Sequence, residues 1–154
     1  MAATTVSGVE ELRARVGEHL GYTEWMTIDQ ERVNLFADAT GDHQWIHVDP
    51  ERAKKESPFG GPIAHGFLTL SLIPDLIPRI LVVEGVKLAV NYGCDRVRFP
   101  APVPVGADVR MGAELQAVDE VGEGVSQVKV RYTIEVRDAP KPSCVADVLF
   151  RYYT

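Results

Sequence analysis

The sequence lacks the features that mark a membrane protein, a secreted protein or a metal-binding protein. It contains only two cysteines, Cys94 and Cys144, which are isolated and show no CxxC or Cys/His spacing. No run of about 18 apolar residues exists, so no segment is expected to span a membrane. Residues 1–23 carry charges throughout and have no apolar core, so they do not resemble a signal peptide. These absences predict a cytoplasmic protein with reduced thiols and no metal centre.

An excess of positive charge is also missing. The chain has 16 Lys and Arg against 22 Asp and Glu, a formal net charge of −6. Nucleic-acid binders and anionic-membrane binders need a basic surface, so we expect neither kind of partner. A smaller anionic ligand needs only a local cluster of Arg and Lys. With 154 residues and 45% hydrophobic content, the chain fits one domain over residues 1–154.

The first third of the chain predicts helices. Apolar residues at helical spacing predict an amphipathic helix over Val6–Leu20. A second helix is expected over about Asp29–Ala39, with either Thr27 or Asp29 as its N-cap. Thr40-Gly41 should end this helix, and a short helix over Pro50–Glu56 is favoured by the proline at its start.

The middle of the chain predicts a central helix. The segment Ala64–Leu81 is apolar on every side, which is typical of a helix buried inside a fold. Pro74 and Pro78 are expected to kink this helix or to end it early.

The second half of the chain predicts strands, with two turns at residues 122–124 and 138–142. The β-rich segments are Val83–Tyr92, Cys94–Phe99, Ala107–Val118, Val125–Arg137 and Ser143–Tyr153. This order predicts an α+β fold in which one curved antiparallel sheet wraps around the long apolar helix. Such a sheet leaves an edge strand open, and pairing that edge with a second copy predicts a homodimer.

An acid and an imidazole lie close together after the second predicted helix. Asp42 and His47 are five residues apart on a short segment, where they could hold a water molecule between them and move its protons. The alternative is that Asp42 makes a local turn bond and His47 is a surface residue.

A glycine opens the central helix. The backbone N–H of Gly66 is expected to point outward at the helix start, where it could stabilise an oxyanion on a thioester or amide carbonyl. Alternatively, Gly66 only permits close packing. His65 is a candidate third polar residue of the site, or it caps or packs against the helix.

Two arginines follow on a predicted strand. Arg96 and Arg98 share a strand face because side chains alternate with period two, and two guanidinium groups suit phosphate recognition. A solvated strand face is the alternative. Asn91 and Tyr92, near a predicted strand end, are candidates for lining a binding pocket.

Two motifs resemble the signature of the MaoC-like, R-specific enoyl-CoA hydratases, which have the hotdog fold. They are residues 39–47, with Asp42 and His47, and Ile63-Ala64-His65-Gly66-Phe67; further similarity runs through residues 86–93 and 96–103. The resemblance covers most of the chain from Tyr22 onward. It implies that Asp42 and His47 are the catalytic pair and that Gly66 supplies the oxyanion N–H. Gln44-Trp45 stands where the family often has Asn-Pro.

The resemblance implies an enzyme that adds water reversibly to trans-2-enoyl-CoA and gives the (R)-3-hydroxyacyl product, in fatty-acid metabolism. An acyl-CoA thioester is then the substrate, and no separate cofactor or metal is expected. Two rival functions remain: a hotdog acyl-CoA thioesterase, and a non-catalytic acyl-CoA-binding or assembly subunit. An acyl-carrier-protein dehydratase is a closer variant, and its acidic carrier would require a basic rim that the composition does not indicate.

Overall fold

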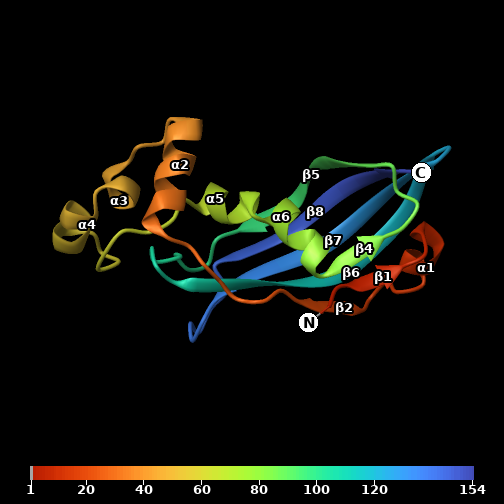
Figure 1. Cartoon of the computed structure of the whole chain (residues 1–154), viewed down its shortest axis with the longest axis horizontal. Helices are drawn as coiled ribbons and strands as arrows, with labels where there is room; N and C mark the ends of the chain where they lie inside the picture. The colour runs from red at the N-terminus through yellow and green to blue at the C-terminus, as the bar shows by residue number, and fades with distance from the viewer. Residues whose placement is uncertain (1) are drawn as a thin grey trace.

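The computed structural model describes residues 2–154 and shows a six-stranded antiparallel sheet that curves over a series of short helices (Figure 1). The strand order is β2-β6-β7-β8-β5, with β3 also paired to β6. The strands of this sheet are β2 (His19–Tyr22), β3 (Met26–Thr27), β5 (Leu88–Arg98), β6 (Asp108–Gly122), β7 (Val125–Val136) and β8 (Cys144–Tyr153). A small parallel pair joins β1 (Thr4–Val6) to β4 (Leu81–Val83). The predicted α+β class with a curved antiparallel sheet is confirmed.

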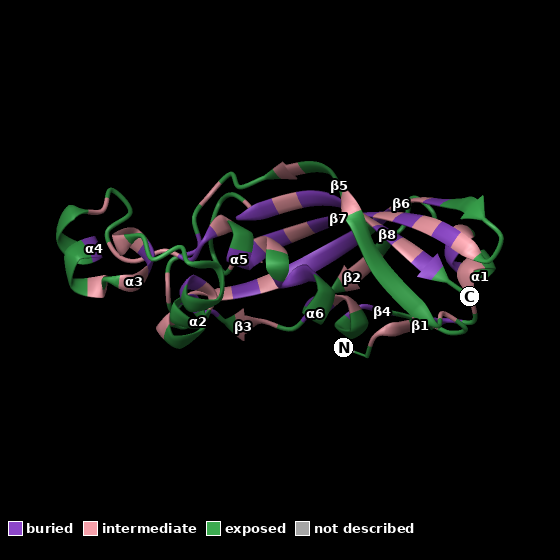
Figure 2. Cartoon of the chain, turned by 90° about the horizontal axis from the view of Figure 1, so that it is seen from above, coloured by how far each residue is buried: buried purple, intermediate pink, exposed green. Residues whose placement is uncertain are grey.

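The core lies between the sheet and the helices. In β7, every second residue from Val128 to Ile134 faces the helices and is almost fully buried, whereas the residues at the alternate positions are partly exposed. Figure 2 shows this alternation as purple and pink bands along β6, β7 and β8. One face of the sheet therefore forms the core and the other face is open, as expected for an antiparallel sheet with one solvated side.

β5 forms one edge of the main sheet. The two predicted segments on either side of residue 93 are a single strand, whose pairing with β8 shifts register between Asn91 and Gly93 and again between Cys94 and Arg96. Most of β5 is exposed (Figure 2). These bulges leave Arg96 opposite Asp147 and Arg98 opposite Val145, so both arginines point away from the helices.

Three helices precede the central segment. α2 (Gln30–Thr40) is capped by Asp29, whose carboxylate accepts a hydrogen bond from Arg32 N–H at 2.9 Å, and it ends at Gly41 with φ 82°. The open choice of cap is thereby decided. α4 (Pro50–Glu56) has the predicted bounds, and α3 (Trp45–Val48) is a short additional turn.

The predicted helix over Val6–Leu20 is wrong in extent. Only α1 (Val9–Arg13) is helical, and the chain then turns at Gly17 with φ 93°, whose N–H donates to Leu115 at 2.8 Å. Residues 19–22 pair with β6 instead. Sheet pairing therefore overrides the local helical periodicity.

The predicted long central helix is also wrong in extent. It is divided into α5 (Gly66–Ser71), α6 (Ile73–Leu76) and the 3₁₀ turn η1 (Ile77–Arg79). The expected interruption by prolines is confirmed, because Pro74 and Pro78 lie at the starts of the second and third pieces and cannot donate a backbone hydrogen bond. The segment is not buried on every side, since Phe67 is 69% exposed. Within residues 2–154, no helix has the length and hydrophobicity needed to span a bilayer.

Candidate active site

The extended link between α4 and α5 holds the site together. Ile63 N–H donates to Ile46 of α3 at 3.0 Å, and Ala64 N–H donates to Val103 at 2.8 Å. The link is therefore attached to α3 on one side and to the segment before β6 on the other. This places the loop after α2, the turn α3 and the start of α5 around one point.

His47 is a buried residue with a fixed tautomer. It is 6% exposed, and its Nδ1 lies 2.6 Å from the carbonyl oxygen of Ile63. A carbonyl oxygen only accepts, so Nδ1 carries the hydrogen and Nε2 presents a lone pair. Burial lowers the pKa of His47 below its ordinary value of 6.5, against the raising effects of the Ile63 bond and Asp42. His47 is therefore a neutral imidazole with Nε2 as a proton acceptor.

His65 contacts both His47 and the Asp42 backbone. It is 3% exposed, and its Nε2 lies 3.0 Å from the backbone carbonyl oxygen of Asp42, to which it donates. Its ring stacks on the ring of His47, with 3.9 Å between centroids, and contacts Phe36. His65 Nδ1 is buried without a partner among residues 2–154. The residue holds the Asp42 backbone and the His47 ring in place.

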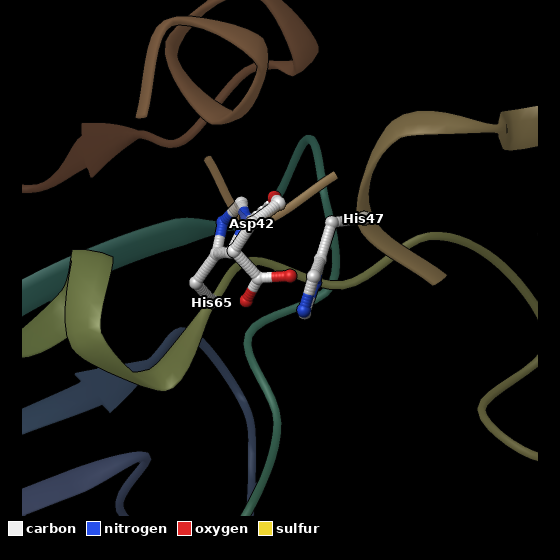
Figure 3. Close-up of side chains that lie close together, drawn as sticks. All are labelled: Asp42, His47 and His65. Atoms are coloured by element: carbon white, nitrogen blue, oxygen red, sulfur yellow. Dashed lines mark hydrogen bonds between the residues drawn. The ribbon is translucent and has the colours of Figure 1, made fainter. Parts of the chain in front are cut away.

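The Asp42 side chain lies beside the two rings. Its Oδ1 accepts the Gln44 N–H at 3.3 Å, so the local turn bond exists. One ligand atom from each of Asp42, His47 and His65 lies within 4.8 Å of the others. Figure 3 shows the Asp42 carboxylate directed toward the His47 ring. The local bond and the pairing with His47 therefore occur together.

Gly66 faces the same cavity. It is the first residue of α5, so its N–H has no acceptor within the helix, and it donates to no other backbone acceptor in residues 2–154. A Cβ at this position would lie 3.2 Å from Cδ2 of Phe99, so any larger residue would press on that ring. The donor and the acid–base pair line one cavity of about 580 Å³.

Four other residues line this cavity, and sequence reasoning did not place them there. They are Phe36, Thr40, Phe67 and Ser71. Ser71 lines the same cavity as Asp42 and gives it a hydroxyl group. Only the rotation of α5 about its axis, fixed by packing, turns this residue toward the cavity.

The remaining predicted site residues lie outside the cavity. Tyr92 is exposed and packs beneath the Arg151 guanidinium, 3.9 Å from its ring centroid, and Asn91 is exposed on β5. Arg96 and Arg98 line a different depression, on the outer face of the sheet. Of the predicted binding residues, the structure therefore places only His65 in the cavity with the acid–base pair.

A metal ion is the other chemistry that Asp42, His47 and His65 suggest by proximity. Each histidine donates one ring N–H to a backbone carbonyl, which leaves Nε2 of His47 and Nδ1 of His65 as the free nitrogens. The two rings are inclined by only 26°, so these lone pairs do not converge on a common point as metal ligands do. Acid–base chemistry fits the arrangement better.

Comparisons with known proteins identify the family of the chain. A family model described as a MaoC like domain matches residues 11–137. The chain is 56% identical over 148 residues to 3-hydroxyacyl-thioester dehydratase Z of Mycobacterium tuberculosis, covering 96% of this chain and 97% of the relative. The monoamine oxidase regulatory protein from Archaeoglobus fulgius has a TM-score of 0.78 at 25% identity, covering 100% of this chain and 99% of that chain. The R-hydratase PhaJ1 from Pseudomonas aeruginosa has a similar fold, with a TM-score of 0.69 at 24% identity, covering 93% and 83%. The chain therefore belongs to the MaoC-like dehydratase family and has its hotdog fold.

Proposed function

We propose that the chain is an (R)-specific hydratase of trans-2-enoyl thioesters, which also dehydrates the 3-hydroxyacyl thioester in reverse. The observation that carries this proposal is the cavity in which a neutral His47, the Asp42 carboxylate and the free Gly66 N–H face one another. The 56% identical relative, named as a 3-hydroxyacyl-thioester dehydratase, supports the same reaction class.

The proposed mechanism uses the three groups in sequence. The thioester carbonyl accepts a hydrogen bond from Gly66 N–H, which draws electron density from the double bond and makes Cβ electrophilic. Water held by Asp42 and His47 adds its oxygen to Cβ while His47 Nε2 takes its proton. The imidazolium, stabilised by the Asp42 carboxylate, returns a proton to Cα as the enolate collapses. The product gains one hydroxyl and one hydrogen, and the residues return to their starting states.

Hydration of crotonyl-CoA tests the proposal directly. We expect the absorbance of the enoyl thioester to fall without release of free thiol, and we expect the product to be (R)-3-hydroxybutyryl-CoA. A thioesterase would instead release free thiol from saturated acyl-CoA. A non-catalytic binding subunit would bind the ester with no change at the enoyl band, and either result would overturn the proposal.

The pH profile should follow the pKa of His47. Because the neutral imidazole is the active form, kcat/KM should fall as pH drops through its lowered pKa, with a midpoint below 6.5. Steady-state rates between pH 4.5 and 8 measure this limb. The His47→Gln variant should lack it, and a midpoint above 6.5 would contradict the neutral, buried base.

The exposed edge at β5 supports a homodimer. Leu88 is 55% exposed and Val90 is 42% exposed on this strand, which has a free side for backbone pairing. Pairing with a second copy would cover both residues and close the edge of the sheet. Analytical ultracentrifugation tests this arrangement, and a monomer at micromolar concentration would contradict it.

A further inference from the structure

Three arginines gather on the outer face of the sheet. Arg96 and Arg98 of β5 and Arg131 of β7 line a depression of about 280 Å³, together with Val145 and Asp147 of β8. The chain as a whole is acidic, with a formal net charge of −6. This depression is therefore a basic patch on an acidic protein.

The charges in the depression are unequally matched. Arg131 donates to both carboxylate oxygens of Asp147, at 2.8 and 3.1 Å, so this pair is satisfied internally. Arg131, and to a lesser degree Lys129 and Arg96, lowers the pKa of Asp147. Neither Arg96 nor Arg98 has a carboxylate within ion-pair distance in residues 2–154, and both are exposed. Two guanidinium groups therefore remain available to an anion from outside.

The depression lies close to the reaction cavity. Gly66 lines both that cavity and a second one of about 390 Å³, which extends along Phe99 and Pro100 to Ser143. Arg98 directly precedes Phe99, and Val145 lies two residues after Ser143, on the outer face of the same strand pair. Three residues of strand, from Arg96 to Phe99, span only about 10 Å. A ligand that leaves the second cavity around the end of β5 and β8 reaches the arginines next.

We infer that Arg96 and Arg98 form a phosphate subsite that binds the nucleotide end of the CoA thioester, while its pantetheine arm occupies the cavity beside Phe99. This inference rests on the proposed function and specifies how the same site holds its substrate. Guanidinium groups bind phosphate oxygens through paired, charge-assisted hydrogen bonds. The internal Arg131–Asp147 pair positions the floor of the depression and leaves the two outer arginines free.

The test compares two substrates that differ only beyond the thioester arm. Crotonyl-CoA carries the phosphates, whereas the crotonyl thioester of N-acetylcysteamine carries none. The Arg96→Gln/Arg98→Gln variant should raise KM for crotonyl-CoA by about 10-fold to 100-fold, since a charge-assisted contact is worth roughly tenfold in affinity. Its kcat for crotonyl-CoA and its kcat/KM for the truncated ester should stay within about twofold of the parent. Arg79→Gln, which removes an exposed arginine paired with Asp75, is the matched control.

Each other outcome would overturn the inference. Unchanged KM for crotonyl-CoA would show that the arginines bind no part of the substrate. Equal losses with both esters would show that they support the fold or the acyl pocket. If KM for crotonyl-CoA is unchanged but KM for crotonyl acyl-carrier protein, assayed as a third substrate, rises in the variant, the surface binds an acidic carrier protein instead of CoA. If the parent protein hydrates neither ester, the proposed function fails, and this is distinguishable because it is measured before any substitution.

Discussion

Replacing His47 by Gln is expected to lower kcat/KM for crotonyl-CoA hydration by about 10²–10⁴-fold, the usual contribution of a general acid–base group. Glutamine keeps a polar side chain of similar length, and the backbone bonds of Ile63 to Ile46 and of Ala64 to Val103, which attach the link between α4 and α5, do not involve the His47 ring. It offers no group that titrates, so the proton of the attacking water has no acceptor. Assays of product formation over long incubation times would measure the residual rate of the variant.

The neighbouring histidine provides the control for this variant. His43 is exposed and pairs with Asp38 at 2.9 Å outside the cavity, so His43→Gln should retain parental activity. Asp42→Asn should lose activity in a similar range, and the double variant should lose little more than either single variant because the two residues act as a unit. Full activity in a folded His47→Gln protein would exclude the mechanism.

Replacing Gly66 by Pro should cost about 10²–10³-fold in kcat relative to Gly66→Ala, the usual effect of removing one oxyanion donor. Both substitutions add a Cβ that meets the Phe99 ring at 3.2 Å, so this steric effect is common to the two variants. Only proline removes the N–H. The comparison therefore isolates one hydrogen bond.

The backbone is suited to this substitution. Proline is favoured at the first position of a helix, where Gly66 lies, and the N–H that it would remove has no backbone acceptor in residues 2–154. His65 has φ −59° and ψ 138°, the extended conformation that a residue before proline prefers. Thermal unfolding of both variants would confirm similar stability. Equal kcat values for the two would remove Gly66 N–H from the mechanism.

The sequence carries the local signals for much of the fold. Asp29 caps the start of α2, Gly41 ends that helix, and Pro50 starts α4. Each effect involves only neighbouring residues, so these helix ends can be predicted from the sequence. The helix expected over Val6–Leu20 is wrong in extent because its last residues pair with β6, and no residue within that segment reveals a partner about 90 positions away.

The sequence likewise predicts some residues of the candidate site but not others. Asp42, His47 and Gly66 belong to two motifs, and the structure brings them together as expected. The position of Ser71 depends on how α5 is rotated, which packing determines. Alternation along β5 places Arg96 and Arg98 on one face, but only the packing of the helices shows that this is the outer face, remote from the cavity. Neither feature is encoded in local spacing.

The bulges in β5 also affect which deletions this strand can accept. Each adds one residue that has no partner on β8, at Tyr92 and at Asp95. Loss of the codon for Asp95 would remove one bulge and leave Arg96 opposite Asp147 and Val97 opposite Ala146, so each side chain would keep its face of the sheet. Loss of a codon at a regularly paired position would instead shift the following side chains to the other face. Single-residue deletions should therefore be better tolerated at the two bulges than elsewhere in β5 among proteins that descend from the same ancestor.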